Sequence, residues 1–232
     1  MIPIFIVGAG PGAVDLITLR ASEKIKDAEV ILWADSLISP NIIKLAAEEC
    51  EIIPTSKLTL EEIIEIMLDR HAKGKRIIRL HDGDPCLYGA ISEQIFPLED
   101  NGIEVEVIPG ISAYQATASA LQRELTIPGL VQTIVLSRAG GRTGMPERET
   151  LESLASLRAS LCLYLSARHV ESTQKILLKY YPADTPLAIG YRVSWDDEWL
   201  GIFTLKEMLS VTRDKGFFRT TIYIISPALS CS

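Results

Sequence analysis

The chain has 232 residues, 47% of them hydrophobic, and a formal net charge of −7 at pH 7. That length permits one large or two small domains with a substantial core. The acidic balance argues against nonspecific binding to nucleic acid, and no apolar run is long enough to span a membrane. Because Met1 leads directly into a strand pattern rather than a leader-like segment, we expect a cytoplasmic protein.

Four cysteines, at positions 50, 86, 162 and 231, lie far apart in the sequence. They lack the C-x-x-C spacing that is typical of zinc sites and redox motifs. We therefore expect reduced cysteines, no disulfide framework and no protein-bound metal.

The first predicted strand, residues 2–7, runs into a glycine-rich turn whose glycines would let a ligand approach the backbone closely. Residues 8–13 match the G-x-G-x-x-A fingerprint of dinucleotide-binding folds, with Asp35 roughly 20 residues further on, where that fingerprint places its ribose-binding acid. However, Pro11 contributes no N–H, and the first good helix cap is Thr18, so the turn departs from that fingerprint. A glycine-containing connection that binds no ligand remains the alternative.

The rest of the first half alternates strands with helices. A continuously apolar run at 29–34 predicts a strand buried on both faces, as in a parallel sheet. Asp35, at its carboxyl end, is a candidate site residue, and an ordinary turn residue is the alternative. This half also contains a short strand at 51–53, a helix from the capping box of Thr59 to a stop at Gly74, and strands at 76–80 and 103–108.

Two further strand ends in this half carry the signals of ligand loops. Residues 81–89 contain Gly83, which permits an unusual backbone angle, and Pro85, which stiffens the turn. An ordinary strand-to-helix turn is the alternative, and the histidine and two aspartates of this loop offer too few oxygen ligands for a hard cation. Residues 109–113 lead into a helix of small side chains. If the sheet is parallel, these two loops and residues 8–15 converge.

The second half has more closely spaced strands, which suggest a mixed sheet. We place the domain boundary between residues 116 and 117, which gives domains 1–116 and 117–232. No flexible linker separates them, so the two α/β domains should pack together and share a cleft. The strands are predicted at 133–137, 161–165, 187–191, 199–204 and 220–225, and the helices at 146–157, 170–180 and 205–212.

Together, the three loops resemble those of the tetrapyrrole methylases, enzymes of cobalamin and sirohaem biosynthesis that use S-adenosylmethionine. The resemblance covers nearly the whole chain. It implies two α/β domains, the first with a mostly parallel sheet, a cofactor bound in the cleft between them, and usually a homodimer. It rests on residues 8–12 (GAGPG), 15–18 (DLIT), 83–85 (GDP), 88–89 (YG) and 109–113 (PGISA).

Within this family, the chain is most similar to the branch that methylates ring carbon 11 of precorrin-4 on the way to cobalamin. That branch implies an anionic tetrapyrrole substrate and S-adenosylhomocysteine as product. No metal-ligand residue separates the metal-free from the cobalt-bearing substrate. The similarity is carried by residues 33–37 (WADSL), 80–85 (LHDGDP), 120–128 (ALQRELTIP), 141–147 (GRTGMPE) and 191–195 (YRVSW).

The resemblance also assigns residues to the cofactor. Pro11 would lie at the mouth of the site, and Leu165 together with Tyr191 or Arg192 would surround the adenine from the second domain. Leu165 stands where the uroporphyrinogen-methylating branch often has methionine, and Asp82 replaces a smaller residue. The residues implied from the first domain are Asp82, Gly83, Asp84, Leu87, Ser112 and Ala113.

Methyl transfer from a sulfonium requires alignment of the reacting atoms more than it requires a protein nucleophile. The substrate carboxylates call for guanidinium groups, so Arg138 and Arg142, with Arg123 behind them, are candidate substrate ligands. Each could instead be an ordinary surface arginine. Asp35 or Glu124 is a candidate to accept a proton or to orient a pyrrole N–H.

Other functions remain open at this stage. One is a methylase of the same fold that acts at another ring carbon, on diphthamide or on ribosomal RNA, although the acidic balance disfavours RNA. A nicotinamide dehydrogenase would use the same glycine pattern but should have a helix that begins inside the turn. A noncatalytic tetrapyrrole carrier would bind the macrocycle without methyl transfer.

Overall fold

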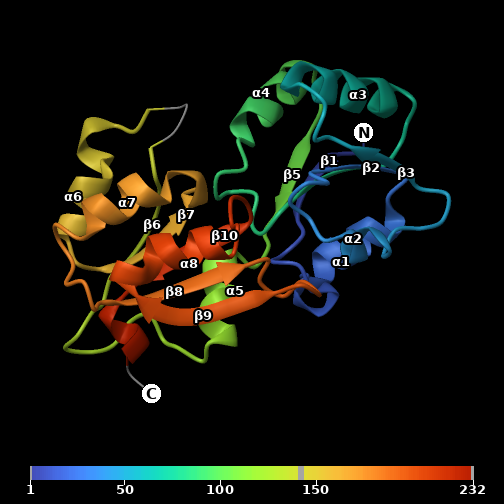
Figure 1. Ribbon diagram of the computed structural model, residues 1–232. Helices are drawn as coiled ribbons and strands as arrows, with labels where there is room; N and C mark the ends of the chain where they lie inside the picture. Colours follow the sequence, from blue (N-terminus) through green and yellow to red (C-terminus); the bar gives the residue numbers. More distant parts are fainter. Residues whose placement is uncertain (1, 141–143, 231–232) are drawn as a thin grey trace. The chain divides into compact units, whose positions relative to one another are not determined.

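The computed structural model describes residues 2–140 and 144–230. The chain divides into two compact units, Met1–Ala113 and Tyr114–Ser232, each with a five-stranded sheet (Figure 1). The sequence placed the boundary between residues 116 and 117, inside helix α5 (Ala113–Ala120), whereas the units divide after the first residue of that helix. Two α/β units, one with a parallel and one with a mixed sheet, agree with the fold class expected from the sequence.

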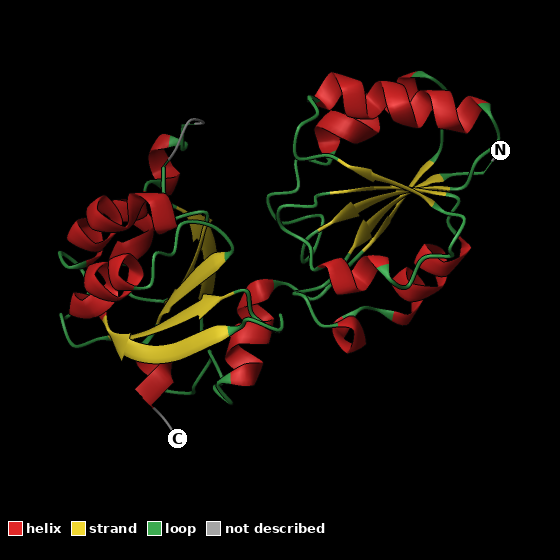
Figure 2. Cartoon of the chain, turned by 45° about the vertical axis from the view of Figure 1, so that its right-hand side comes forward, coloured by secondary structure: helices red, strands yellow, loops and turns green. Residues whose placement is uncertain are grey.

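The first unit has an entirely parallel sheet with the strand order β3-β2-β4-β1-β5. Figure 2 shows helices on both faces: α1 and α2 pack on one, and α3 and α4 on the other. Strands covered on both faces are buried on both sides, and β1 and β4 are wholly buried. β1 is apolar throughout, whereas β4 also buries Arg79 and His81. The strands are β1 (Ile4–Gly8), β2 (Val30–Trp33), β3 (Glu51–Pro54), β4 (Ile77–His81) and β5 (Val105–Ile108), and the helices α1 (Leu19–Asp27), α2 (Pro40–Ile43), α3 (Leu60–Ala72) and α4 (Ser92–Asp100).

The starts of α1 and α3 confirm the predicted caps. The Thr18 hydroxyl accepts a hydrogen bond from the Ala21 N–H at 3.2 Å, and Thr59 forms a complete capping box with Glu62. Helix α4, by contrast, was not predicted. It contains Pro97, which interrupts the helical signal in the sequence, yet its turns form around the buried residues Gln94 and Leu98.

The second unit has a mixed sheet with the order β6-β7-β10-β8-β9, in which only β6 and β7 are parallel. Helix α6 begins later than predicted, because Thr150 is extended (ψ 151°) and caps α6 through the Ser153 N–H. The strands are β6 (Ile134–Arg138), β7 (Ser160–Tyr164), β8 (Pro186–Tyr191), β9 (Trp199–Thr204) and β10 (Thr221–Ile225), and the further helices α6 (Leu151–Ser156), α7 (Val170–Leu177) and α8 (Met208–Asp214).

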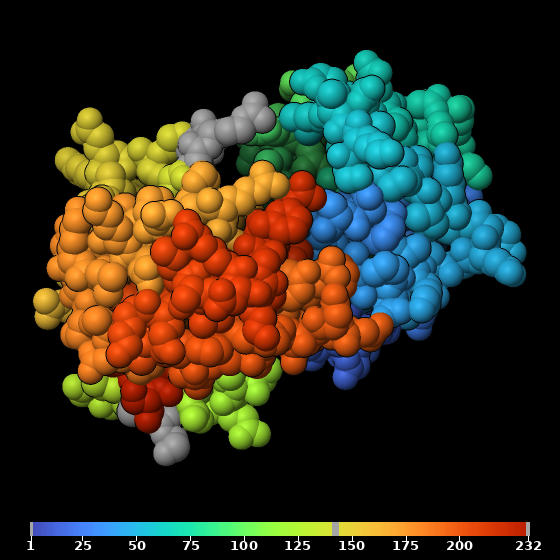
Figure 3. Space-filling view, in the orientation of Figure 1, coloured from blue at the N-terminus to red at the C-terminus, as the bar shows by residue number. Residues whose placement is uncertain are grey.

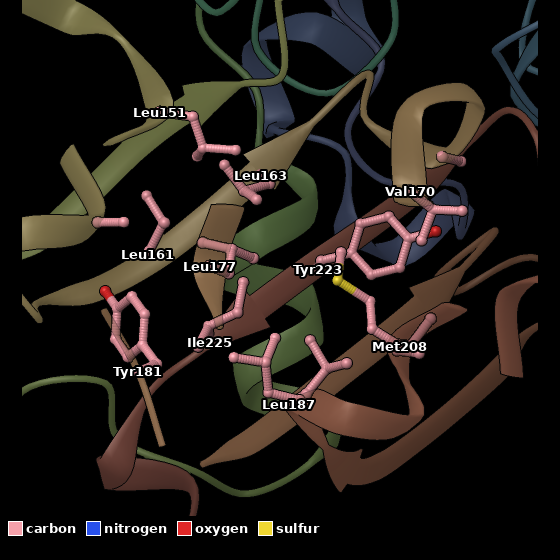
Figure 4. Packing of buried hydrophobic residues seen from close by; sticks show 14 residues of the cluster. Leu151, Leu161, Leu163, Val170, Leu177, Tyr181, Leu187, Met208, Tyr223 and Ile225 are labelled. Carbon is pink, nitrogen blue, oxygen red and sulfur yellow. The ribbon is translucent and has the colours of Figure 1, made fainter. Parts of the chain in front are cut away.

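The core of the second unit lies between its sheet and helices α6, α7 and α8 (Figure 4). Tyr223 of the central strand β10 is fully buried, and its hydroxyl lies 2.9 Å from the Thr212 hydroxyl of α8. The hydroxyl of Tyr181 also has a hydrogen-bond partner: it donates to the Ala159 carbonyl at 2.9 Å. On the face drawn in Figure 3, residues late in the sequence make up most of this unit's surface. None of the described helices is long and apolar enough to cross a bilayer.

Candidate functional site

The carboxyl ends of β1 and β4 form the centre of the candidate site in the first unit. The two strands are neighbours, but the connection from β1 leads over β4 to β2, whereas the connection from β4 leads over β1 to β5. Neighbouring strands whose connections leave in opposite directions mark the place where open α/β sheets bind ligands. The loops predicted as ligand loops, residues 8–15 and 81–89, start at this point.

These two loops are joined by backbone hydrogen bonds. The Gly83 N–H donates to the Gly10 carbonyl at 2.9 Å, and the Gly10 N–H donates to the Gly83 carbonyl at 3.2 Å. Ala9 adds a third bond, from its N–H to the His81 carbonyl at 2.8 Å. The loops therefore behave as one continuous backbone layer, which confirms that they converge.

The third loop, residues 109–113, packs on this layer through glycine. A Cβ on Gly110 would lie 2.1 Å from the Gly83 oxygen, and a Cβ on Gly8 would lie 2.7 Å from the same atom. Gly83 itself has φ +56°, a left-handed angle that favours glycine. Gly8 and Gly110 thus permit close contact between the loops rather than direct approach of a ligand.

Asp84 holds the second and third loops together through its carboxylate. Oδ2 accepts the Gly110 N–H at 3.0 Å, and Oδ1 accepts the Cys86 N–H at 2.8 Å. The sequence assigned Asp84 to the cofactor, and the structure gives its carboxylate a role in positioning the loops. Of the other residues assigned there, Asp82 is exposed, Pro11, Gly83, Leu87 and Ala113 are half-buried, and Ser112 is buried beside Gly83.

In the second unit, strained residues gather at one edge of the sheet. The ends of β7 and β8 adjoin the start of the antiparallel strand β10. Leu165, Arg192 and Thr220, which lie at these three points, have φ angles of +51°, +45° and +46°. Left-handed angles in residues other than glycine cost energy and occur preferentially at functional sites. We call these three residues the strained rim.

The side chains of the strained rim are also unusual. Leu165 is 64% exposed despite being apolar. Arg192 pairs with Asp197 at 2.6 Å and stacks on Trp195, with 4.9 Å between its guanidinium carbon and the ring centroid, yet its buried Nε has no hydrogen-bond partner among the described residues. Tyr191 stacks on Phe217 with ring centroids 4.6 Å apart. An exposed apolar contact and a fixed aromatic pair together suit a heteroaromatic ligand.

A groove with a volume of about 670 Å³ lies in the second unit, between the start of α7 and the end of α8. Arg168, Lys175 and Arg213 line it, and Arg213 pairs with Glu171 at 2.6 Å. Its basic lining suits an anionic ligand. No local pattern predicts this groove, because its residues come mainly from two helices that are distant along the chain.

The candidate catalytic carboxylates are engaged in local hydrogen bonds. Asp35 accepts from the Ser56 N–H at 2.8 Å and from the Ser56 hydroxyl at 2.7 Å. Desolvation acts to raise its pKa, but the bonds from Ser56 outweigh this effect and lower the pKa below the ordinary value. Glu124 accepts from the Thr126 hydroxyl at 3.1 Å. Asp35 is thus better suited to holding the loop after β3 than to accepting a proton.

The candidate substrate arginines lie in three different settings. Arg123 is half-buried and donates through Nε to the Leu229 carbonyl at 3.2 Å. Arg138 ends β6 and donates to the Gly144 carbonyl at 3.3 Å. Arg142 lies outside the described residues. Within the described part of the chain, no group of three or more His, Cys, Asp or Glu side chains could hold a metal ion.

Comparison with known proteins relates this geometry to one family. The model of the Tetrapyrrole (Corrin/Porphyrin) Methylases matches residues 3–209. The chain is 39% identical to a cobalt-precorrin-4 C(11)-methyltransferase of Methanocaldococcus jannaschii, over 98% of this chain and 88% of that protein. It is 39% identical to a precorrin-4 C(11)-methyltransferase of Pseudomonas aeruginosa, over 98% of this chain and 90% of that protein.

Solved structures give the same relation. A cobalt-precorrin-4 methyltransferase of cobalamin biosynthesis superimposes with a TM-score of 0.94 at 38% identity, covering 98% of this chain and 95% of the other. A uroporphyrin-III C-methyltransferase from Thermus thermophilus, in complex with S-adenosylhomocysteine, has a TM-score of 0.81 at 26% identity, covering 99% of this chain and all of the other.

Proposed function

Because this chain belongs to the tetrapyrrole methylase family, we propose that it is an S-adenosylmethionine-dependent methyltransferase that methylates ring carbon 11 of precorrin-4 in cobalamin biosynthesis. The observation that carries the proposal is the 39% identity, over almost the whole chain, to methyltransferases named for that reaction in both its cobalt and its metal-free form. The interlocked loops and the strained rim support the proposal, because the first form a fixed backbone layer and the second includes an exposed apolar side chain.

The residues present fit the cofactor. When bound, S-adenosylmethionine supplies an electrophilic methyl group on a positively charged sulfur. The loops of the first unit, joined through Gly10, Gly83 and Asp84, would bind it and fix its orientation. In the second unit, exposed Leu165 offers an apolar contact that an adenine would use.

The protein's main task in this reaction is alignment, because holding two reactants in position removes most of the entropic part of the barrier. Arg138 and the basic groove of Arg168 and Lys175 are candidates to bind substrate carboxylates, with Arg142 and Arg123 as the further candidates from the sequence. No protein nucleophile is needed. We also propose a cytoplasmic homodimer without a resident metal ion.

The decisive test is a calorimetric titration of the protein with S-adenosylhomocysteine. Leu165→Ala should weaken binding by about tenfold or more, because truncation removes an apolar contact with the ligand. Leu157→Ala is the matched control, since Leu157 is 61% exposed and also lies in the second unit. Methyl transfer would then be followed by mass spectrometry with precorrin-4 and with its cobalt form.

Each outcome has a defined meaning. Failure of the folded parent protein to bind S-adenosylhomocysteine would overturn the proposal, and tight binding of reduced nicotinamide instead would support a dehydrogenase. Tetrapyrrole binding without methyl transfer would indicate a carrier. An equal loss of affinity for S-adenosylhomocysteine in Leu165→Ala and Leu157→Ala would show that Leu165 does not contact the cofactor. The methyl-transfer measurement would still test the activity.

A further inference from the structure

A buried polar cluster lies beneath the 82–90 loop, in the first unit. Arg79 and His81 project from the same face of β4, because they are two residues apart in a strand, and Gln94 comes from the first turn of α4. Their exposed fractions are 6%, 5% and 4%. Polar groups at such depth are costly unless hydrogen bonds satisfy them, so their partners define what the cluster does.

Gln94 is the centre of the cluster. Its Oε1 accepts the Arg79 Nε–H at 3.1 Å, while its Nε2 lies 3.4 Å from each of three acceptors: His81 Nε2 and the carbonyl oxygens of Gly89 and Ala90. One amide group has two N–H donors, so the three acceptors share them. The amide oxygen of Gln94 thus accepts a hydrogen bond from the buried Arg79 guanidinium, and its amide nitrogen contacts the carboxyl-terminal end of the 82–90 loop.

The charge states of the cluster support this orientation. Burial, reinforced by the charge of Arg79, lowers the pKa of His81 to about 3, so the imidazole is neutral and its Nε2 can accept the Gln94 N–H. Burial lowers the pKa of Arg79 to about 10, against the effect of Asp82, and the guanidinium stays protonated at neutral pH. Arg79 also donates to the Leu80 carbonyl at 3.1 Å, which ties the cluster to the sheet.

The segment that Gln94 reaches is strained and tightly folded. Tyr88 and Ala90 have φ angles of +60° and +49°, and a Cβ on Gly89 would lie 2.2 Å from the Pro85 oxygen. Such conformations persist only where the surrounding structure enforces them. Because Asp84 fixes the beginning of this loop and Gln94 contacts its end, the two side chains hold it from both sides.

We propose that Gln94 is a positioning residue for the cofactor loop 82–90, with Arg79 and His81 holding its amide in the orientation that the loop requires. The inference rests on the proposed function, because it takes this loop to bind S-adenosylmethionine. A loop held in advance in its binding conformation has less entropy to lose when the ligand binds.

Gln94→Glu tests the proposal sharply. Glutamate keeps the size of the side chain and an oxygen acceptor for Arg79, but it removes the N–H donors to Gly89, Ala90 and His81. We expect about tenfold weaker binding of S-adenosylhomocysteine and a similar rise in KM for S-adenosylmethionine, with kcat changed less than about twofold. Amide hydrogen exchange should rise in residues 82–91 and not in the strands of the sheet.

The chain offers a matched control in the second unit. Gln174 of α7 is also buried, and its Nε2 donates to the carbonyls of Leu205 and Lys206 at 2.8 and 2.9 Å. Gln174→Glu removes the same kind of donor from two backbone carbonyls remote in sequence from the loop. It should leave the affinity and the exchange of residues 82–91 unchanged.

The outcomes separate this inference from the proposed function. Unchanged affinity and exchange in a folded Gln94→Glu variant would overturn the positioning role, as would an equal loss of affinity in Gln174→Glu. If Gln94→Glu does not fold, Gln94→Asn, which withdraws the same amide from the loop without adding charge, should show the same loop-confined pattern. Failure of the parent protein to bind S-adenosylhomocysteine would count against the proposed function, whereas the exchange measurement would still report on the contacts between Gln94 and the loop.

Discussion

The carboxyl edge of the first sheet and the strained rim of the second unit are built in opposite ways. In the first unit, three loops are interlocked by backbone hydrogen bonds, by glycines that permit close approach, and by the carboxylate of Asp84. In the second unit, Leu165, Arg192 and Thr220 hold left-handed angles, and Leu165 is largely exposed. The first edge therefore derives its shape from mutual contacts between loops, whereas the second holds three residues in strained backbone conformations.

The largest effect should come from disturbing the glycine contacts of the first edge. Gly110→Ala places a Cβ 2.1 Å from the Gly83 oxygen, so the loops must move apart. We expect a loss of about 3 kcal/mol in the free energy of unfolding, measured by urea denaturation. Gly140→Ala is the control, because a Cβ there meets no described atom within 4 Å, and it should change stability by less than about 0.5 kcal/mol. If Gly110→Ala lowered the free energy of unfolding no more than Gly140→Ala does, the loops would not be interlocked.

The second effect concerns the carboxylate that joins two of those loops. Asp84→Ala leaves the Gly110 and Cys86 N–H groups without their acceptor and should lower the free energy of unfolding by about 2 kcal/mol. Asp84→Asn keeps one oxygen and should lose about half as much. If Asp84→Ala abolishes S-adenosylhomocysteine binding but retains full stability, the carboxylate contacts the ligand directly, and its positioning role is wrong.

The pH dependence of stability tests the buried cluster of the same edge. His81 has a pKa of about 3 in the folded protein against 6.5 in a free side chain, so the unfolded state binds more protons between those values. Its contribution is therefore fully present above about pH 6.5 and is lost as the pH falls toward 3. Lowering the pH from about 7.5 to about 5 should cost about 2 kcal/mol through this group. The difference between the unfolding curves of the parent and His81→Asn over this range isolates the effect, and parallel curves would contradict it.

The smallest effect tests the strain of the second edge. Leu165→Gly removes the left-handed penalty but adds freedom to the unfolded chain, so we expect the protein to gain about 0.5 kcal/mol in stability while losing affinity for S-adenosylhomocysteine. Leu157 has an ordinary helical φ of −68°, and Leu157→Gly should instead lose about 1 kcal/mol without affecting the ligand. If both variants lost stability, as measured by thermal unfolding, the left-handed conformation of Leu165 would carry no strain that glycine relieves.

Much of the candidate site was accessible from local sequence signals. Glycine patterns, strand ends and helix caps such as Thr18 predicted the three loops, and the alternation of buried strands with helices predicted the parallel sheet. These features depend on few neighbouring residues, which is why a pattern reveals them. Helix α4 was not predicted, because Pro97 masks its helical periodicity, and Gln94, which lies in this helix, was therefore not identified from the sequence.

Local patterns were thus enough to predict the two α/β units, the family resemblance and the positions of the loops, because backbone propensity and hydrophobic periodicity depend on neighbouring residues. Which groups meet is visible only in the folded chain: Gly110 packs on Gly83, Asp84 holds a loop, and Gln94 joins a buried arginine to a strained turn. Such pairings depend on strand order and on the depth at which a side chain is buried, and both arise only when distant segments of the chain pack together.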